Sequence, residues 1–205
     1  MSGGVTSVQL AQDVWVAYGK RPTESTCSGD ICAATGLPQW RRWEMLAARG
    51  LLRALLAKVA PASAEADLVP AANGKPVLDG WPRVGVSLSH DIDVIAAAVG
   101  VGCQVGVDIQ LPPDQLSNRI IYRCMRIRAP DLLALTAAER ATEFAWMWSV
   151  QEACVKCDGS GISGRPWAID VPLRPRAGRW RDLTWITLRD HTDLPVSCAF
   201  GGPLC

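Results

Sequence analysis

Two long stretches with helical spacing, each accompanied by short strand-like runs, most constrain how this chain can fold. Across residues 38–59 the apolar side chains recur at steps of three and four, which is the spacing of an amphipathic helix. A second, mostly helical stretch is predicted over residues 117–158, with an interruption near residues 129–130. The strand-like runs are short and separated by glycine-containing turns, which indicates small mixed or antiparallel sheets. They cover residues 5–18, 84–89, 94–101, 105–109, 167–171, 180–188 and 196–200.

Each half of the chain therefore contains helix and several short strands, although no strict sequence repeat relates the halves. A Pro-Pro pair at 112–113 breaks regular structure shortly after the midpoint, and residues 136–139 have the Thr-x-x-Glu pattern of a capping box that begins a helix. This content predicts an α+β fold made of two α+β halves, with helices packed on strongly bent sheets. We assign residues 1–104 to the N-terminal half and residues 105–205 to the C-terminal half.

The charge balance limits the kinds of partner. The chain has 205 residues and a formal net charge of +1, which does not provide the broad basic field of a nucleic-acid-binding protein. No stretch approaches the roughly 18 to 20 apolar residues of a membrane span, and the N-terminus lacks the charged and apolar blocks of a signal peptide. We therefore expect a cytoplasmic protein with no nucleic-acid or membrane partner, in which any phosphate site depends on a few locally placed cations.

The eight cysteines raise the question of redox or metal chemistry. Without a secretory signal a disulfide framework is not expected, because the cytosol keeps thiols reduced. Residues 154–157 form a CxxC pair, but the chain has only two histidines and no second CxxC to complete a metal site. We therefore interpret the following as small, buried apolar side chains: Cys103, Cys124, Cys154 and Cys198.

An acid at the end of a strand is the first candidate for chemistry. In the run from Gly106 to Gln110, side chains alternate between faces, so Asp108 and Gln110 point the same way while Val107 and Ile109 point into the core. Removing an acid from water beside apolar residues is costly unless a cation or hydrogen-bond donors compensate it. Asp108 is therefore a candidate site residue; the alternative is that it only caps the following turn, and these residues alone do not decide between the two.

A carboxylate and an ammonium one helical turn apart are the second candidate. On a helix, Trp148, Glu152 and Lys156 share one face. Such pairs are usually ordinary surface ion pairs, but this one lies in an apolar, tryptophan-rich stretch. A metal ligand and a phosphate-binding cation are the functional interpretation.

The third candidate is the end of the strand that carries Ser89 and His90. His90 has the chemistry of a phosphate donor or a general base, although a single histidine is more often structural. No Ser-His-Asp order and no Gly-x-Ser-x-Gly motif support a hydrolase, and the glycines of residues 159–164 do not form a Walker loop.

Taken together and in order, these segments resemble the 4′-phosphopantetheinyl transferase superfamily, in its longer, surfactin-synthetase-activating type. The resemblance covers roughly residues 38–172. It rests on an arginine-bearing helix and five short motifs: Trp40–Arg53, Asn73–Pro76, Ser87–His90, Val105–Gln110, Trp148–Lys156 and Gly159–Gly161.

The resemblance implies two similar halves that form a pseudo-dimer, with the active site in the cleft between them. It implies that the serine hydroxyl of an apo carrier protein (peptidyl, polyketide or fatty-acid) attacks the β-phosphorus of coenzyme A, so that adenosine 3′,5′-bisphosphate leaves. A bound Mg²⁺ would assist this transfer. Because one chain supplies both halves, the resemblance implies a monomer.

The resemblance also implies a role for each matching residue. Asp108 and Glu152 would be ligands of Mg²⁺, with Gln110 as a further ligand, directly or through a water. Glu152, or a water, would take the serine proton, and Lys156 would stabilise the charge that builds on the phosphate. The groups implied to hold coenzyme A and its phosphates are Arg49, Arg53, Lys75, Ser89, His90 and Lys156.

Two positions depart from the family pattern. Gln110 stands where a third acid is often found, which predicts weaker Mg²⁺ binding than at a three-acid site. Gln151 stands where many relatives have lysine, and its helical position predicts an effect on surface charge rather than on chemistry. Two alternatives stay open: a catalytically weakened module that binds coenzyme A or carrier proteins, and a different Mg²⁺-dependent phosphoryl or nucleotidyl transferase.

Overall fold

The computed structural model describes residues 5–20 and 22–204. The expectation about a signal peptide depends in part on residues 1–4, which lie outside the described residues. Within the described ranges, no helix combines the length and apolar character that crossing a membrane requires.

The strands form two antiparallel sheets, and each sheet is drawn from one part of the chain. The first has six strands in the order β1-β2-β6-β5-β4-β3: β1 (Thr6–Ala11), β2 (Val14–Lys20), β3 (Leu68–Pro70), β4 (Pro76–Leu78), β5 (Val84–Asp91) and β6 (Val94–Val101). The second has four strands in the order β7-β10-β9-β8: β7 (Cys103–Ile109), β8 (Ala177–Trp180), β9 (Leu183–Thr187) and β10 (Val196–Pro203).

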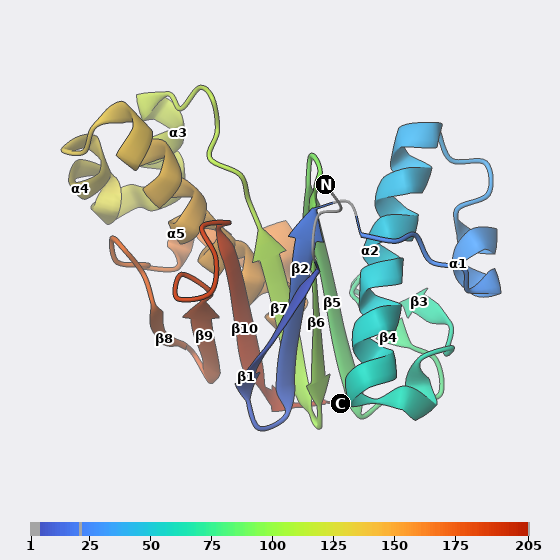
Figure 1. Cartoon of the computed structure of the whole chain (residues 1–205). Coiled ribbons are helices and arrows are strands. Elements are labelled where there is room, and N and C mark those ends of the chain that lie inside the picture. The colour runs from blue at the N-terminus through green and yellow to red at the C-terminus, as the bar shows by residue number, and fades with distance from the viewer. Residues whose placement is uncertain (1–4, 21, 205) are drawn as a thin grey trace.

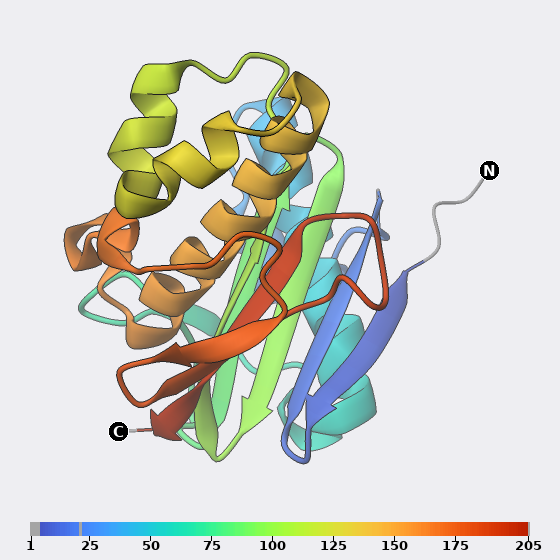
Figure 2. The same ribbon diagram turned by 90° about the vertical axis from the view of Figure 1, so that its left-hand side faces the viewer.

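Two long helices cover these sheets, and shorter helices surround them (Figure 1). Figure 2 shows α3 and α4 grouped beside the N-terminal part of α5. The α-helices are α1 (Ser28–Ala33), α2 (Gln39–Val59), α3 (Asn118–Met125), α4 (Ala129–Leu133) and α5 (Ala137–Asp158). Short 3₁₀ helices are η1 (Pro61–Ser63), η2 (Arg126–Arg128), η3 (Gly161–Gly164) and η4 (Pro166–Ala168).

The core is layered as helix, sheet, sheet and helix. Helix α2 packs on one face of the first sheet through alternate residues such as Val86, Ala97 and Val99. The intervening residues of β2 and β6 face the second sheet, where they pack against apolar side chains of β7 and β10. Helix α5 covers the far face of the second sheet. Strand β6 is buried on both faces, because the alternation of its side chains serves both layers.

The structure confirms the α+β class and the helix signals. Helix α5 begins at the expected capping box: Thr136 accepts the Glu139 amide, and the Glu139 side chain accepts the Thr136 amide. The strand expected over residues 167–171 is wrong. The chain there forms η4, in which the Ala168 amide bonds to the Arg165 carbonyl. The apolar residues that suggested a strand, Ile169 and Val171, are buried against α5 rather than paired in a sheet.

Close packing between β7 and α5 depends on Gly106. A Cβ atom at this position would lie 2.1 Å from the Ala153 carbonyl oxygen and 2.3 Å from the Cys157 amide nitrogen, both backbone atoms of α5. We expect Gly106→Ala to destabilise the fold by about 1–3 kcal/mol through overpacking, measured by chemical denaturation. Gly74→Ala is the control. Gly74 has open space around it but φ of +82°, so this variant measures the cost of backbone strain without overpacking. An unchanged midpoint for Gly106→Ala would show that the helix moves away without cost.

Candidate active site

Strands β5 and β7 belong to different sheets, and two serine side chains connect them. The Ser87 hydroxyl accepts a hydrogen bond from the Val107 amide at 3.0 Å, and the Ser89 hydroxyl accepts one from the Ile109 amide at 3.3 Å. Serines at alternate positions of β5 therefore meet alternate amides of β7, because side chains repeat on one face every second residue. This contact gives the Ser-Leu-Ser motif a structural role and brings the ends of both strands together.

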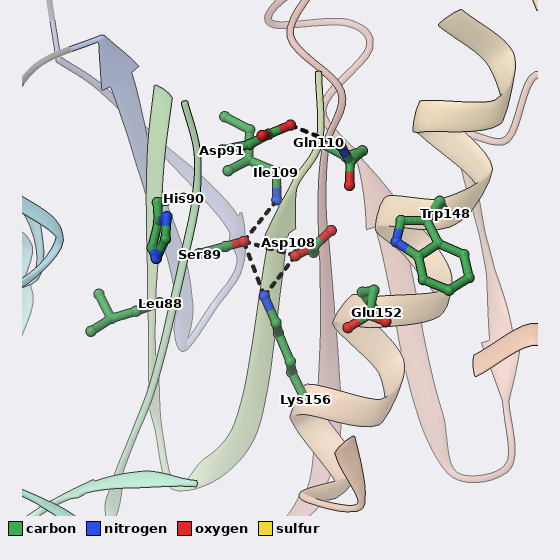
Figure 3. Close-up of a pocket in the computed structure, with 10 residues that line it drawn as sticks. All are labelled: Leu88, Ser89, His90, Asp91, Asp108, Ile109, Gln110, Trp148, Glu152 and Lys156. Atoms are coloured by element: carbon green, nitrogen blue, oxygen red, sulfur yellow. Dashed lines mark hydrogen bonds and ion pairs between the residues drawn. The ribbon is translucent and has the colours of Figure 1, made fainter. Parts of the chain in front are cut away.

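An ion pair lies where these strands meet helix α5 (Figure 3). The Lys156 ammonium donates to Asp108 Oδ1 at 2.6 Å and to Ser89 Oγ at 3.0 Å. Ser89 in turn donates its hydroxyl proton to the same Oδ1 at 2.7 Å. The side chain of Asp108 is only 8% exposed, so its charge is compensated by donors as burial requires. Three elements, β5, β7 and α5, thus contribute to one cluster.

Glu152 faces this cluster from one turn earlier on α5 (Figure 3). Burial and, to a lesser extent, the charge of Asp108 raise the pKa of the Glu152 carboxyl, while Lys156 lowers it. The carboxylates of Asp108 and Glu152 thus share one pocket with the Lys156 ammonium, which is bonded to Asp108.

These groups line a pocket of about 280 Å³ between the two sheets and α5. As the strand alternation predicts, Asp108 and Gln110 both contribute to it. The complete lining is Leu88, Ser89, His90, Asp91, Asp108, Ile109, Gln110, Trp148, Glu152 and Lys156.

The oxygen groups of this pocket fit a hard divalent cation. Asp108 and Glu152 supply carboxylates and Gln110 supplies an amide, which are the ligand types that Mg²⁺ prefers. Burial and the nearby charge of Asp108 raise the pKa of the Glu152 carboxyl, and a cation bound there would favour its ionised form. Within the described ranges, no group of three or more His, Cys, Asp or Glu side chains is placed to hold a metal ion.

His90 lies on the other side of β5 from Ser89 (Figure 3). It is exposed, and it lines both the pocket and a neighbouring cavity of about 540 Å³ that reaches α2. Arg41 and Arg49 of α2 line the same cavity. The structure thus places His90 at the border between the pocket of Asp108 and the cavity that Arg41 and Arg49 line.

Arg53 points toward Asp30 and not into the pocket of Asp108. Its guanidinium donates to both carboxylate oxygens of Asp30 and to the carbonyls of Ala64 and Ala66. It lines a separate cavity with residues 23–27. The structure does not bring Arg53 to the pocket of Asp108, and its hydrogen bonds show a structural role.

Lys75 connects the two parts of the chain at the C-terminal end of α5. Its ammonium donates to the Cys157 carbonyl at 2.6 Å and to Gln104 Oε1 at 3.3 Å. Burial lowers the pKa of Lys75, partly offset by Cys157 and Asp158. Lys75 lines a cavity of about 210 Å³ together with Lys156, so this cavity adjoins the pocket through a shared cation.

The expectation for Gln151 is wrong. Its side chain is buried, with 1% of the residue exposed, and its amide nitrogen donates to the carbonyls of Cys124 and Ile169. Position 151 therefore does not affect surface charge, because the helix face that points away from Glu152 is itself covered by α3 and the segment after η4. Sequence reasoning also missed that Ser87 joins β5 to β7 and that the Asp91 carboxylate accepts a hydrogen bond from the Gln110 amide. The alternation of Ser87 with Ser89 was the available signal for the Ser87 contact.

The cysteines lie mainly away from the site. Cys154, Cys157 and Cys198 are fully buried, whereas Cys103 and Cys124 are partly buried. Burial raises the pKa of the Cys157 thiol to about 12. All seven cysteines among the described residues are free thiols, and Cys205 lies outside those residues.

Comparison with known proteins gives matches to one family. The sequence model of the 4′-phosphopantetheinyl transferase superfamily matches residues 104–200. The 4′-phosphopantetheinyl transferase psf-1 of Bacillus pumilus is 37% identical over 93 residues, which are 44% of this chain and 39% of that protein. The matched region thus spans well under half of the relative. The match nevertheless contains the strand of Asp108 and the helix of Glu152 and Lys156, and it confirms the resemblance that the motifs indicate: over residues 104–200 this chain matches the 4′-phosphopantetheinyl transferase superfamily.

Proposed function

We propose that this chain transfers the 4′-phosphopantetheine arm of coenzyme A to a serine of an apo carrier protein, with Mg²⁺, and releases adenosine 3′,5′-bisphosphate. The observation that carries the proposal is the pocket that Asp108, Glu152 and Lys156 share within the matched region. The pocket contains two facing carboxylates and a cation, which suits a reaction between a hydroxyl and a phosphate group.

Asp108, Glu152 and Gln110 are the residues that would hold the metal. When bound there, Mg²⁺ would neutralise phosphate charge and polarise the phosphoryl oxygens. The Asp108 oxygen Oδ1 accepts hydrogen bonds from Lys156 and Ser89, so we propose that the other carboxylate oxygen would meet the metal.

Glu152 would accept the proton of the carrier serine. Its carboxylate lines the pocket beside Asp108, and a positioned carboxylate can take the proton of a hydroxyl directly or through a water. Lys156, on the same helix face, would stabilise negative charge on the phosphate as the bond to the leaving group breaks. Ser89 would hold Lys156 and Asp108 in position.

Coenzyme A would be bound along the cavities that adjoin this pocket. His90 and Arg49 line the branch toward α2, and Lys75 lines the branch toward the β3–β4 turn. In this proposal residues 1–104 supply most contacts to coenzyme A, while residues 105–205 supply the metal ligands and the catalytic groups. Because elements of both parts line one pocket within a single chain, we propose that the active form is a monomer.

Intact-mass spectrometry of apo carriers incubated with coenzyme A and Mg²⁺ tests the proposal. We expect a gain of one phosphopantetheine on at least one carrier when peptidyl, polyketide and fatty-acid carriers are compared side by side. Carriers whose acceptor serine is replaced by alanine are the matched control, and they should gain no mass. If none of several apo carriers gains mass, the chain is not a transferase of this kind.

A second candidate function is a module that binds coenzyme A without turnover. The amide of Gln110 in place of a third acid is the observation that favours it. This candidate predicts calorimetric binding of coenzyme A together with no mass gain on any carrier. It also predicts that Glu152→Ala leaves the affinity for coenzyme A unchanged.

A further inference from the structure

We infer that Asp91 is a positioning residue for the metal site: its carboxylate orients the Gln110 side chain so that the amide oxygen faces the pocket as a neutral ligand. The inference rests on the proposed function, because it concerns the Mg²⁺ that the function requires. It differs from the metal site itself in that Asp91 acts only through its neighbour.

The orientation of Gln110 follows from the chemistry of its partners. The amide nitrogen Nε2 donates to Asp91 Oδ2 at 2.8 Å and to the Leu111 carbonyl oxygen at 3.2 Å. A carboxylate and a carbonyl can only accept hydrogen bonds, so both amide protons of Gln110 are used there. A flipped amide would set its oxygen against two acceptors. The oxygen must therefore point the other way, and Figure 3 shows it turned toward the side where Asp108 and Trp148 lie.

Asp91 is itself held firmly. Its Oδ2 also accepts the Leu111 amide at 2.6 Å, so the backbone of residue 111 and the side chain of Gln110 share one carboxylate oxygen. Asp91 is the last residue of β5 and pairs with Val94 across a tight turn. Strand β5 is joined to β7 by the two serine contacts, which fixes the distance between Asp91 and Gln110.

The consequence concerns which end of the amide a cation would meet. An amide oxygen is a good ligand for Mg²⁺, whereas an amide nitrogen carries two protons and repels a cation. Without Asp91 the Gln110 side chain would lose the nearer and charged one of the two acceptors that distinguish its two ends. Partners that orient a ligand typically change metal affinity by about 10- to 100-fold when they are removed.

Metal binding to the full chain without coenzyme A tests this inference. The protein is titrated with Mn²⁺, an ion that also prefers oxygen ligands, and the free Mn²⁺ is measured by electron paramagnetic resonance. Mg²⁺ is then added to displace the bound Mn²⁺. We expect Asp91→Ala and Gln110→Ala each to weaken Mn²⁺ binding by about 10-fold. The double variant should bind no more weakly than Gln110→Ala alone, since Asp91 acts through Gln110. Asp91→Asn, whose side-chain oxygen still accepts, should remain within about 3-fold of the wild type.

Asp93→Ala is the matched control, because Asp93 carries the same charge in the turn between β5 and β6 and should leave Mn²⁺ binding unchanged. The inference is overturned if the fold-loss of Mn²⁺ affinity in the double variant equals the product of the two single losses. It is also overturned if Asp91→Ala binds Mn²⁺ as tightly as the wild type, or if the wild type binds no Mn²⁺. If Asp91→Ala does not fold, the ¹³C signal of the Gln110 side-chain carbonyl in the wild type, assigned by its loss in Gln110→Ala, decides: it should shift on adding Mg²⁺, and no shift overturns the inference.

These readouts separate the inference from the proposed function. A protein that modifies a carrier but shows equal Mn²⁺ affinity in Asp91→Ala and wild type contradicts only the role of Asp91. A protein whose single and double variants show the expected Mn²⁺ affinities but which transfers nothing to any carrier contradicts only the proposed transferase function.

Discussion

Glu152→Gln is expected to lower kcat/KM for carrier modification by at least about 100-fold, which is the lower range for losing a general acid–base group. The substitution keeps the size of the side chain but removes the charge that would bind Mg²⁺ and accept the serine proton. The measurement is the rate of carrier mass gain at saturating coenzyme A and Mg²⁺. A variant with more than a tenth of the wild-type rate would exclude Glu152 from both roles.

The same substitution is expected to stabilise the protein at neutral pH. Burial and, secondarily, the charge of Asp108 raise the pKa of Glu152 above its ordinary value of 4.5. The folded state therefore holds this proton more tightly than the unfolded state, and the wild type loses stability as the pH rises from about 4.5 through the raised pKa. Removing such a charge from a functional site typically adds about 1 kcal/mol, which corresponds to a rise of about 2–4 °C in Tm.

The pH dependence and a control on the same helix make this test specific. The difference in Tm between Glu152→Gln and the wild type should shrink as the pH is lowered toward 4.5, where Glu152 becomes protonated in both states. Glu139→Gln, at the exposed start of α5, should keep full activity and lower the Tm slightly, because the hydrogen bond from Thr136 lowers the pKa of Glu139. A Glu152→Gln variant that is less stable than the wild type at pH 7 would contradict the interpretation.

Asp30→Ala is expected to destabilise the protein by about 3–5 kcal/mol, because it leaves two arginines without their buried partner. Asp30 is fully buried in α1, and it accepts hydrogen bonds from Ser25, Arg49 and Arg53. Arg53 also donates to two carbonyls after α2, so this carboxylate joins α1, α2 and the segment that follows. We expect the Tm to fall by about 10 °C, measured by differential scanning calorimetry.

Asp170→Ala provides the matched control. Asp170 makes the same kind of two-point contact with Arg128, but both side chains are exposed, at 48% and 34%. Exposed pairs contribute about 0–1 kcal/mol, so the control should change the Tm little. Equal falls in Tm for Asp30→Ala and Asp170→Ala would show that burial does not increase the contribution of the Asp30 ion pairs to stability.

The contribution of Asp30 should also depend on pH in a defined direction. Burial on its own would raise the pKa of Asp30, but the bonds from Arg53, Ser25 and Arg49 outweigh burial and lower it. The stabilisation is therefore fully present above the ordinary value of 3.8 and is lost as the pH falls through the lowered pKa. The gap in stability between Asp30→Ala and the wild type should be constant near neutral pH and narrow only in strong acid.

The elements with strong local signals could be predicted from the sequence. Helix α2 follows the expected spacing over residues 38–59, and α5 begins at its capping box. Local signals also misled: residues 167–171 are mostly apolar and look like a strand, yet Ile169 and Val171 pack in the core beside α5 without pairing in a sheet. Apolar residues show that a segment is buried but not whether its backbone hydrogen bonds are made with a sheet or within a turn.

The sequence by itself determined that Glu152 and Lys156 share a helix face and that Asp108 and Gln110 share a strand face, because helical and strand periods fix these relations locally. The tertiary structure alone decided which distant groups meet them. It placed Ser89 and Lys156 on one oxygen of Asp108, and it turned Arg53 to Asp30 and away from the pocket. It also set Asp91 against Gln110, across two strands whose registers no local pattern specifies. Such contacts depend on how the two sheets pack, and packing is a property of the whole chain.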